Sequence, residues 1–274
     1  MKLNVDHIQF NLLINESDFN NEKTPIVFLH GFTGRSADWQ FIFTKIPTKF
    51  FPIAIDLIGH GETDSPENQD YYSCHAIVRQ IDSIINQLNI KKFIIAGYSM
   101  GGRAALAYSF KNPQKIIAAI LESTSPGIEE FSLKKERVEL DFLLSDKIKK
   151  EGVESFIEYW FNIPIFESLK KHPNFEDEKK MRNQNSAAGL ANILSSFSTG
   201  LMPSLWSKLH LLEFPVLLLS GELDEKYTDI NNEMKNKLPK AIYKSIPECG
   251  HNVHLEKPEL FTKFVLDFLN SIER

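Results

Sequence analysis

The residue whose type and spacing most clearly indicate chemistry is Ser99, the serine of the sequence GYSMG. An apolar run at 93–96 precedes this motif, and a stretch of helix-forming residues at 103–107 follows it. A strand, one hydroxyl between two glycines and then a helix form the pattern of a nucleophile elbow. The turn is so tight that only glycine fits at Gly97 and Gly101. It also places Ser99 at a helix N-terminus, where developing negative charge is favoured. The pattern therefore predicts the active centre of an enzyme.

A serine hydroxyl is too weak an acid to react alone, so it needs a base, and the base needs an orienting carboxylate. Asp224 follows the apolar run at 216–219, and His251 follows a second such run at 241–246. If both runs are strands, these side chains lie in loops at the strands' carboxyl ends. The order serine, acid, histidine is the one found in hydrolase sheets. We therefore assign Asp224 as the orienting acid and His251 as the proton shuttle, and leave open whether Ser99 or His251 first accepts the proton.

Other titratable residues nearby provide alternatives to this assignment. Glu222 or Asp229 could replace Asp224, but Asp224 is the shorter acid in the tighter turn. His254 lies three residues after His251, which could suggest a metal pair. A zinc site needs a third ligand at recognisable spacing, and the sequence has neither a His-Glu-x-x-His motif nor a Cys-x-x-Cys pair. We expect no metal, and we expect His254 to cap or pack against the final helix.

Backbone amides are expected to complete the active centre as an oxyanion hole. In an elbow of this kind, one donor is the amide that follows the nucleophile, here Met100. The second comes from the loop after the first main strand, and the sequence HGFTG at 30–34 provides that loop. Phe32 is the predicted donor in this loop.

Arg103 lies four residues after Ser99 and therefore on the same side of a helix. An ester substrate with a neutral acyl chain gains nothing from a cation there, whereas an anionic substrate would be held by a charge-assisted fork. The chain has only 6 arginines beside 25 lysines, and two of them, Arg137 and Arg182, fall in the segment that lacks strand patterns. These arginines are candidates for anion binding, with a surface salt bridge as the alternative for Arg137 and Arg182.

The elements that must position these residues alternate between apolar runs and helical periodicity, which is typical of an α/β protein with a mostly parallel sheet flanked by helices. Strands are predicted at 26–29, 51–55, 93–96, 116–121, 216–219 and 241–246, with a final helix starting at Lys257-Pro258. The strand pattern stops between about 126 and 206, where helix-forming and charged residues predominate, with Val138, Phe142, Ile157 and Trp160 at amphipathic spacing. We expect residues 1–126 and 207–274 to form the core, and residues 127–206 to form a helical cap over the carboxyl ends of the strands.

Composition limits the classes of partner. The length of 274 residues fits one large domain with an insert, and the net charge of −5 without a basic run argues against nucleic acid. The apolar runs are too short to span a bilayer, and the polar N-terminus does not resemble a secretion signal. Cys74 and Cys249 are expected to be reduced thiols. These features predict a cytoplasmic enzyme that acts on a small molecule.

With these residues assembled, the chain resembles the α/β-hydrolase fold and, more narrowly, the 2-succinyl-6-hydroxy-2,4-cyclohexadiene-1-carboxylate (SHCHC) synthase family. The resemblance covers nearly the whole chain. Its motifs are LHGFTG at 29–34, DWQ at 38–40, GHG at 59–61, GYSMGGR at 97–103, ESTSPG at 122–127, ER at 136–137, Trp160, Arg182, PSLW at 203–206, GELD at 221–224 and GHNVH at 250–254. The arginine after Gly102, together with the arginines and tryptophan of the cap, makes this match more specific than the elbow alone.

The resemblance implies a lyase of menaquinone biosynthesis that needs no cofactor. The family eliminates pyruvate from a cyclohexene that carries a succinyl chain and an enolpyruvyl ether, and Ser99, His251 and Asp224 would remove a ring proton. Arg103, Arg137 and Arg182 match family positions that bind the substrate's three carboxylates. Tyr98 and Trp160 match positions that line the pocket.

Two other functions use overlapping residues. A serine hydrolase acting on esters or on carbon–carbon bonds of ring-cleavage products needs the same three catalytic side chains, and Arg103 is the feature that argues against it. A ligand receptor built on the same scaffold has no need for all three of Ser99, Asp224 and His251.

Overall fold

The computed structural model describes residues 1–15 and 22–272. Within these ranges the strands form an eight-stranded sheet in the order β1-β2-β4-β3-β5-β6-β7-β8. The strands are β1 Lys2–Val5, β2 Ile8–Ile14, β3 Thr24–Leu29, β4 Phe50–Ile55, β5 Phe93–Tyr98, β6 Ile116–Glu122, β7 Val216–Gly221 and β8 Ala241–Ile246. β1 pairs antiparallel with β2 and β2 antiparallel with β4, and the remaining pairs are parallel. The predicted α/β class with a mostly parallel sheet is confirmed.

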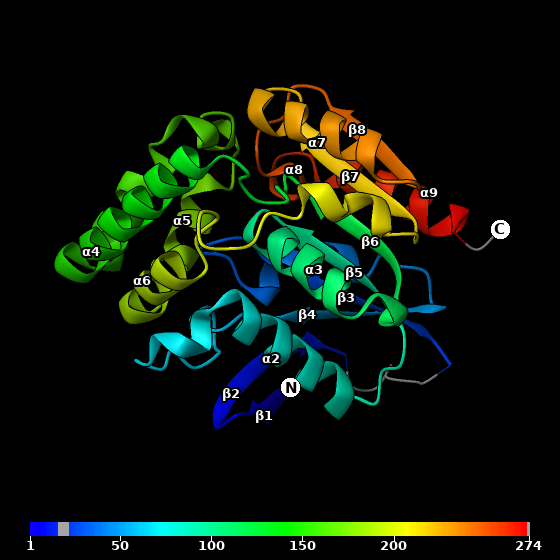
Figure 1. Ribbon diagram of the computed structural model, residues 1–274, viewed down its shortest axis with the longest axis horizontal. Coiled ribbons are helices and arrows are strands. Elements are labelled where there is room, and N and C mark those ends of the chain that lie inside the picture. The colour runs from blue at the N-terminus through cyan, green and yellow to red at the C-terminus, as the bar shows by residue number, and fades with distance from the viewer. Residues whose placement is uncertain (16–21, 273–274) are drawn as a thin grey trace.

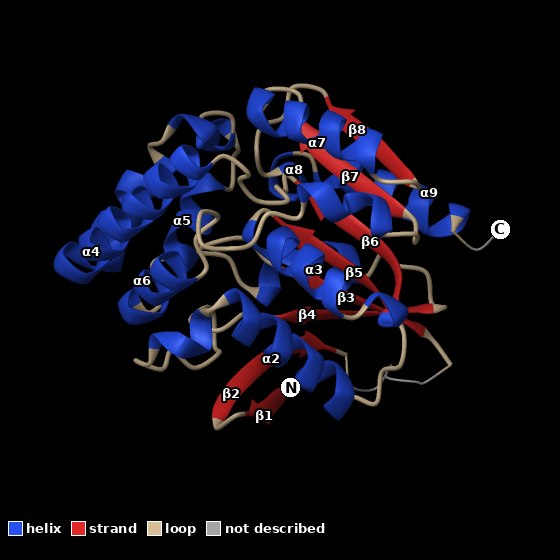
Figure 2. Cartoon of the chain, viewed as in Figure 1, coloured by secondary structure: helices blue, strands red, loops and turns tan. Residues whose placement is uncertain are grey.

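Helices cover both faces of the sheet (Figures 1 and 2). They are α1 Gln40–Phe43, α2 Cys74–Gln87, α3 Met100–Lys111, α7 Glu225–Lys237, α8 Val253–Glu256 and α9 Pro258–Ser271, with α4, α5 and α6 in the segment between β6 and β7. Alternate residues of the central strands point to opposite faces, so Val27 and Phe28 of β3 belong to different core clusters. The first cluster includes Met234 of α7, and the second includes Phe261 of α9. The sheet is therefore buried on both sides, as its continuous apolar strands require.

The hairpin of β1 and β2 was absent from the sequence-based prediction. Its residues alternate between buried and exposed, for example Ile8 and Phe10 inward and Gln9 outward. Five of the six predicted strands are continuous apolar runs, whereas this edge pair mixes polar and apolar residues. The hairpin extends the sheet beyond β4 and lies far from Ser99 in the strand order.

The segment between β6 and β7 is helical and forms a layer of its own beside the sheet (Figure 1). Its helices are α4 Phe131–Phe161, α5 Phe175–Arg182 and α6 Ala187–Ser196. α4 is broken at Gly152, whose φ of 82° departs from helical geometry. Residues of α4 and α6, including Ile157 and Leu190, share a small core of their own.

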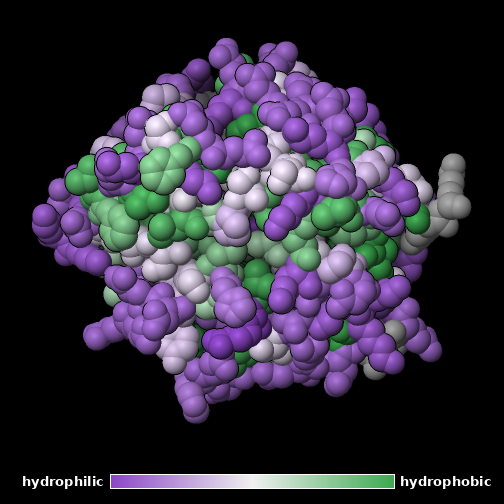
Figure 3. Space-filling view, viewed as in Figure 1, coloured by the Kyte–Doolittle hydropathy of each residue, from purple (hydrophilic) through white to green (hydrophobic). Residues whose placement is uncertain are grey.

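One part of the predicted amphipathic pattern of α4 is wrong. Ile157 is fully buried, but Phe142 is 46% exposed, and Leu143 next to it is 68% exposed. Figure 3 shows hydrophobic side chains gathered on the surface over α4. The two halves of α4, separated by Gly152, do not share one apolar stripe. Among the helices of the described ranges, none combines the length and the apolar composition that crossing a bilayer requires.

Candidate active site

Ser99 lies in the turn between β5 and α3, with φ 49° and ψ −105°. Its amide donates a hydrogen bond to the carbonyl oxygen of Glu122 at 2.8 Å, which fixes the turn against β6. A Cβ at Gly97 would collide with the backbone of Gly101, and a Cβ at Gly101 would collide with the carbonyl of Leu29. The two glycines are therefore required by close backbone packing, as the sequence pattern predicted.

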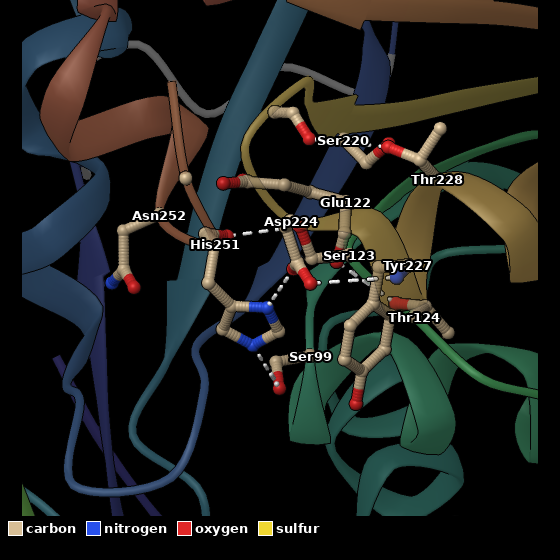
Figure 4. Close-up of polar contacts among 12 residues, drawn as sticks. Ser99, Glu122, Ser123, Thr124, Ser220, Asp224, Tyr227, Thr228, His251 and Asn252 are labelled. Carbon is tan, nitrogen blue, oxygen red and sulfur yellow. Dashed lines mark hydrogen bonds and ion pairs between the residues drawn. The ribbon is translucent and has the colours of Figure 1, made fainter. Parts of the chain in front are cut away.

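The structure brings Ser99, His251 and Asp224 together in one hydrogen-bonded chain (Figure 4). His251 Nε2 lies 3.1 Å from Ser99 Oγ, and His251 Nδ1 lies 2.6 Å from Asp224 Oδ2. Because an ionised carboxylate only accepts hydrogen bonds, Nδ1 carries the proton and donates to Asp224. The other nitrogen, Nε2, is then free to accept the hydroxyl proton of Ser99. Neither Glu222 nor Asp229 takes the place of Asp224 as the hydrogen-bond partner of His251.

Backbone contacts hold the two loops that carry Asp224 and His251. Asp224 is the N-cap of α7, where its Oδ1 accepts a hydrogen bond from the amide of Tyr227 at 3.4 Å. The carbonyl of His251 accepts a hydrogen bond from Ser123 Oγ at 2.9 Å. Glu256 of α8 accepts hydrogen bonds from the amides of Gly250 and Asn252 on either side of the histidine. The imidazole and its carboxylate are thus positioned by fixed backbone.

A cavity of about 380 Å³ opens next to Ser99 between the sheet and the inserted helices. Its lining consists of residues from both parts of the chain: Phe32, Tyr98, Ser99, Met100, Arg103, Arg137, Asp141, Trp160, Ile163, Pro164, Ile165, Phe166, Ile193, Leu194, Phe197, Ser198, Thr199, Lys226, Tyr227 and His251. Most of these side chains are apolar, and the charged ones are few. Such a mixture is typical of a small-molecule site in which a few polar groups fix the orientation of the ligand.

Arg103 lines this cavity with an unusual set of neighbours. Its Nη1 donates to the carbonyl of Phe197 at 2.7 Å and lies 3.7 Å from the sulfur of Met202, and its guanidinium lies over the Phe197 ring. Within the described ranges no carboxylate forms an ion pair with it. Burial, and then the charge of nearby Arg137, lowers the pKa of Arg103 to about 10, so the group remains charged at neutral pH. A buried cation without a carboxylate partner has the chemistry to pair with an anionic group of a ligand.

The two arginines of the inserted helices are placed differently from each other. Arg137 lines the cavity, and its Nε donates to Asp141 Oδ2 at 2.9 Å. Arg182 does not line this cavity and instead lies beside a separate small one. Its guanidinium forms a bidentate salt bridge with the Asp38 carboxylate, with N–O distances of 2.9 and 3.0 Å. Each of the two side chains is 4% exposed. Arg182, predicted from the family resemblance to bind a substrate carboxylate, here has its fork occupied by buried Asp38 and lies apart from the cavity that Arg103 lines.

The other predicted lining residues do meet at the cavity. Tyr98 donates a hydrogen bond to Asn252 Oδ1 at 2.6 Å, and its ring packs 5.2 Å from that of His251. Trp160 and Phe32 are in edge contact at 5.2 Å. Phe32 and Met100, the residues predicted to provide the oxyanion-hole amides, also line the cavity beside Ser99.

His254 lies outside the cavity, where its Nδ1 is 2.8 Å from Glu122 and its ring stacks on Trp39 at 4.6 Å. The described residues contain no cluster of three or more side chains suited to metal binding.

Sequence reasoning missed two residues of the cavity, Lys226 and Tyr227. The Tyr227 ring lies 4.7 Å from that of His251, and its hydroxyl interacts with Ser99 (Figure 4 shows the two side chains). Burial raises the pKa of Tyr227, so the phenol stays protonated. The available signal was the position of Asp224: the N-cap residue of a helix places the first turn, which contains both missed residues, next to itself.

Comparisons with known proteins identify the fold and the family of the chain. The family model for the alpha/beta hydrolase fold matches residues 24–258. A Bacillus subtilis (strain 168) protein, provisionally named 2-succinyl-6-hydroxy-2,4-cyclohexadiene-1-carboxylate synthase, is 41% identical over 92% of each chain. The Enterobacter (strain 638) protein of that name is 30% identical over 85% of this chain and 86% of its own.

Among solved structures, MenH from S. aureus matches with a TM-score of 0.88 and 33% identity, covering 97% of this chain and 99% of the other. An enol-lactonase from Burkholderia xenovorans LB400 matches with a TM-score of 0.82 at 18% identity, covering 98% of this chain and 100% of the other, which indicates a common fold alone. The chain therefore belongs to the α/β-hydrolase fold and, within it, to the SHCHC synthase family.

Proposed function

We propose that this protein is a lyase of menaquinone biosynthesis that eliminates pyruvate from 2-succinyl-5-enolpyruvyl-6-hydroxy-3-cyclohexene-1-carboxylate to give SHCHC. The observation that carries the proposal is an unpaired Arg103 in the same cavity as the Ser99–His251–Asp224 chain. The synthase names of relatives at 30% and 41% identity support the same reaction. The substrate is a small molecule with three carboxylates, which suits a cavity of about 380 Å³ lined by cations.

In the proposed mechanism the ring carbon that carries the succinyl group loses its proton to Ser99. Ser99 in turn transfers its hydroxyl proton to His251, which Asp224 holds in the required tautomer. The electron pair left on carbon shifts through the ring double bond, and the carbon–oxygen bond to the enolpyruvyl group breaks. The departing enolate takes up a proton and becomes pyruvate, so that no water is added and no bond is hydrolysed.

The amides of Phe32 and Met100 are proposed to stabilise the negative charge that builds on the succinyl ketone as the proton leaves. Removing one such donor typically costs about 3 kcal/mol of transition-state stabilisation. Residues 127–206 are proposed to act as a cap domain, since the inserted helices supply Arg137 and Trp160 to the cavity wall. A wall of this kind reduces the access of water to the reacting atoms.

A coupled assay tests the proposal directly. Purified protein is mixed with the enolpyruvyl substrate, and released pyruvate is measured through lactate dehydrogenase and NADH. We expect rapid pyruvate release, and only slow turnover of nitrophenyl esters. Efficient ester hydrolysis with no pyruvate release would reject the lyase and favour a serine hydrolase.

A further inference from the structure

Three cations line the cavity beside Ser99: Arg103, Arg137 and Lys226. Asp141 is the single acidic residue of the lining among the described residues, and it accepts a hydrogen bond from Arg137. Asp224 is close by but is already bonded to His251. The cavity therefore contains more positive charge than its own carboxylates neutralise.

Lys226 is an exposed residue in the first turn of α7, directly before Tyr227. Its Nζ lies 5.6 Å from the centre of the Tyr227 ring, and within the described part of the chain no carboxylate lies within ion-pair distance of it. Partial burial of the ammonium, with the positive charge of Arg137, lowers the pKa of Lys226 below its ordinary value. Two cations that repel each other in this way are both stabilised by an anion placed between them.

Lys226 and Arg137 also share a position at the mouth of the cavity. Both residues line the cavity beside Ser99 and also a second cavity of about 510 Å³, whose lining includes Glu129, Glu130, Glu136 and Glu233. Arg103, by contrast, lines the cavity beside Ser99 but does not line the second cavity. The charges are therefore arranged with one cation deep inside and two at the opening.

We propose that Lys226 joins Arg103 and Arg137 as a third cation of the substrate pocket, and that with Arg137 it binds the substrate carboxylate lying at the pocket mouth. The proposal rests on the proposed function for the identity of the substrate, a tricarboxylate. It follows from two observations: Lys226 lies in the lining of the cavity beside Ser99, and among the described residues it has no acidic partner within ion-pair distance. Lys226 is then a specificity-determining residue and takes no part in proton transfer.

The test compares Lys226→Gln with Lys235→Gln, which removes an exposed lysine from the last turn of the same helix, away from both cavities. We expect Lys226→Gln to raise the KM for pyruvate elimination about threefold to fivefold, which is the loss of one partly screened charge pair, with kcat nearly unchanged. Lys226→Arg should restore KM, because a cation at this position is sufficient. Lys235→Gln should change neither constant. Equal KM values for Lys226→Gln and Lys235→Gln would overturn the inference and leave the proposed lyase function standing.

A binding measurement separates this inference from the proposed function. Benzene-1,3,5-tricarboxylate, a six-membered ring with three carboxylates, is titrated calorimetrically into the wild type and both glutamine variants. Weaker binding to Lys226→Gln alone supports the third cation even if the wild type releases no pyruvate. Identical binding to all three proteins would reject it.

Discussion

At the scale of single residues, the site contains two groups with different roles: His251 with its acid–base partners, and the cation Arg103. His251 is held by Asp224 and faces Ser99, so its role is proton transfer. Arg103 is fixed by a backbone carbonyl and a ring, which orient its charge but do not neutralise it. A charge oriented in this way before the ligand arrives needs little rearrangement when the ligand binds.

Replacing Arg103 with methionine keeps most of the contact with Phe197 and removes the charge. We expect kcat/KM for pyruvate elimination to fall at least about a hundredfold, because a buried charge-paired fork contributes roughly 3 kcal/mol. Lys111→Met, at the exposed end of the same helix, is the control and should have no effect. Unchanged kinetics in Arg103→Met would remove the argument for an anionic substrate.

Ser99 has a positive φ, which an L-residue adopts only at an energetic cost of about 1–3 kcal/mol. Ser99→Gly relieves this strain, although glycine also gains freedom in the unfolded chain. We expect the variant to lose activity and to gain about 1 kcal/mol in free energy of unfolding, measured by urea denaturation. Ser99→Ala, which retains a Cβ, should lose activity without the gain. A destabilised Ser99→Gly would show that the turn is not strained.

At the scale of elements, the pair between Arg182 at the end of α5 and Asp38 joins the inserted helices to the loop after β3. Both partners are 4% exposed, so removing one leaves the other charge buried. We expect Arg182→Met to lower the free energy of unfolding by about 3–5 kcal/mol. At a temperature where the variant is folded, kcat/KM should stay within about threefold of wild type.

Lys180→Met, an exposed change on the same helix, controls for the general effect of losing a cation. A stable Arg182→Met protein with a large rise in KM would instead return Arg182 to substrate binding.

The positions of the elements could be predicted where the sequence carries one dominant signal. The central strands are uninterrupted apolar runs, and Gly97 and Gly101 have no alternative in so tight a turn. The edge hairpin at 2–14 lacks such a run because one side of it faces solvent. Pattern identified the strands that are buried on both faces, and it missed this polar edge hairpin.

The sequence predicted which side chains of the acid–base chain contact one another, but it did not predict which groups the arginines contact. Ser99, Asp224 and His251 each follow a strand of one parallel sheet, so topology brings them to the same edge. Arg182 comes from a segment whose packing the sequence does not specify, and its partner Asp38 lies 144 residues away. A long cationic side chain can reach either the cavity or a carboxylate such as Asp38, and the tertiary structure determines which of them it contacts.

At the scale of the whole molecule, buried histidines tie stability to pH. Burial and neighbouring His30 lower the pKa of His60 to about 3, whereas in an unfolded chain a histidine titrates near 6.5. Between these pH values the unfolded chain binds more protons than the folded one, so the stability present above pH ~6.5 is lost as the pH falls towards 3.

His60→Asn retains a donor towards the carbonyl of Ile58 but removes the titrating ring. We expect it to reduce the loss of unfolding free energy below pH ~6.5 by up to about 1.4 kcal/mol per pH unit, measured by urea denaturation between pH 7.5 and 5.5. His75→Asn, at an exposed position, should keep the wild-type slope. Identical slopes in both variants would mean that His60 titrates in the native protein as it does in the unfolded chain.

The hydrogen bond from Arg103 to the carbonyl of Phe197 connects α3 to the residue directly after α6. Occupancy of the pocket and the stability of this helix end are consequently linked equilibria, because a ligand that holds the guanidinium in place also favours the helix end bonded to it. At a hundred times its Kd, a ligand that binds only while this helix end is formed would stabilise it by about 2.7 kcal/mol. Amide hydrogen exchange along α6 would then slow as the tricarboxylate is added, so that exchange at the backbone detects ligand binding at the Arg103 side chain.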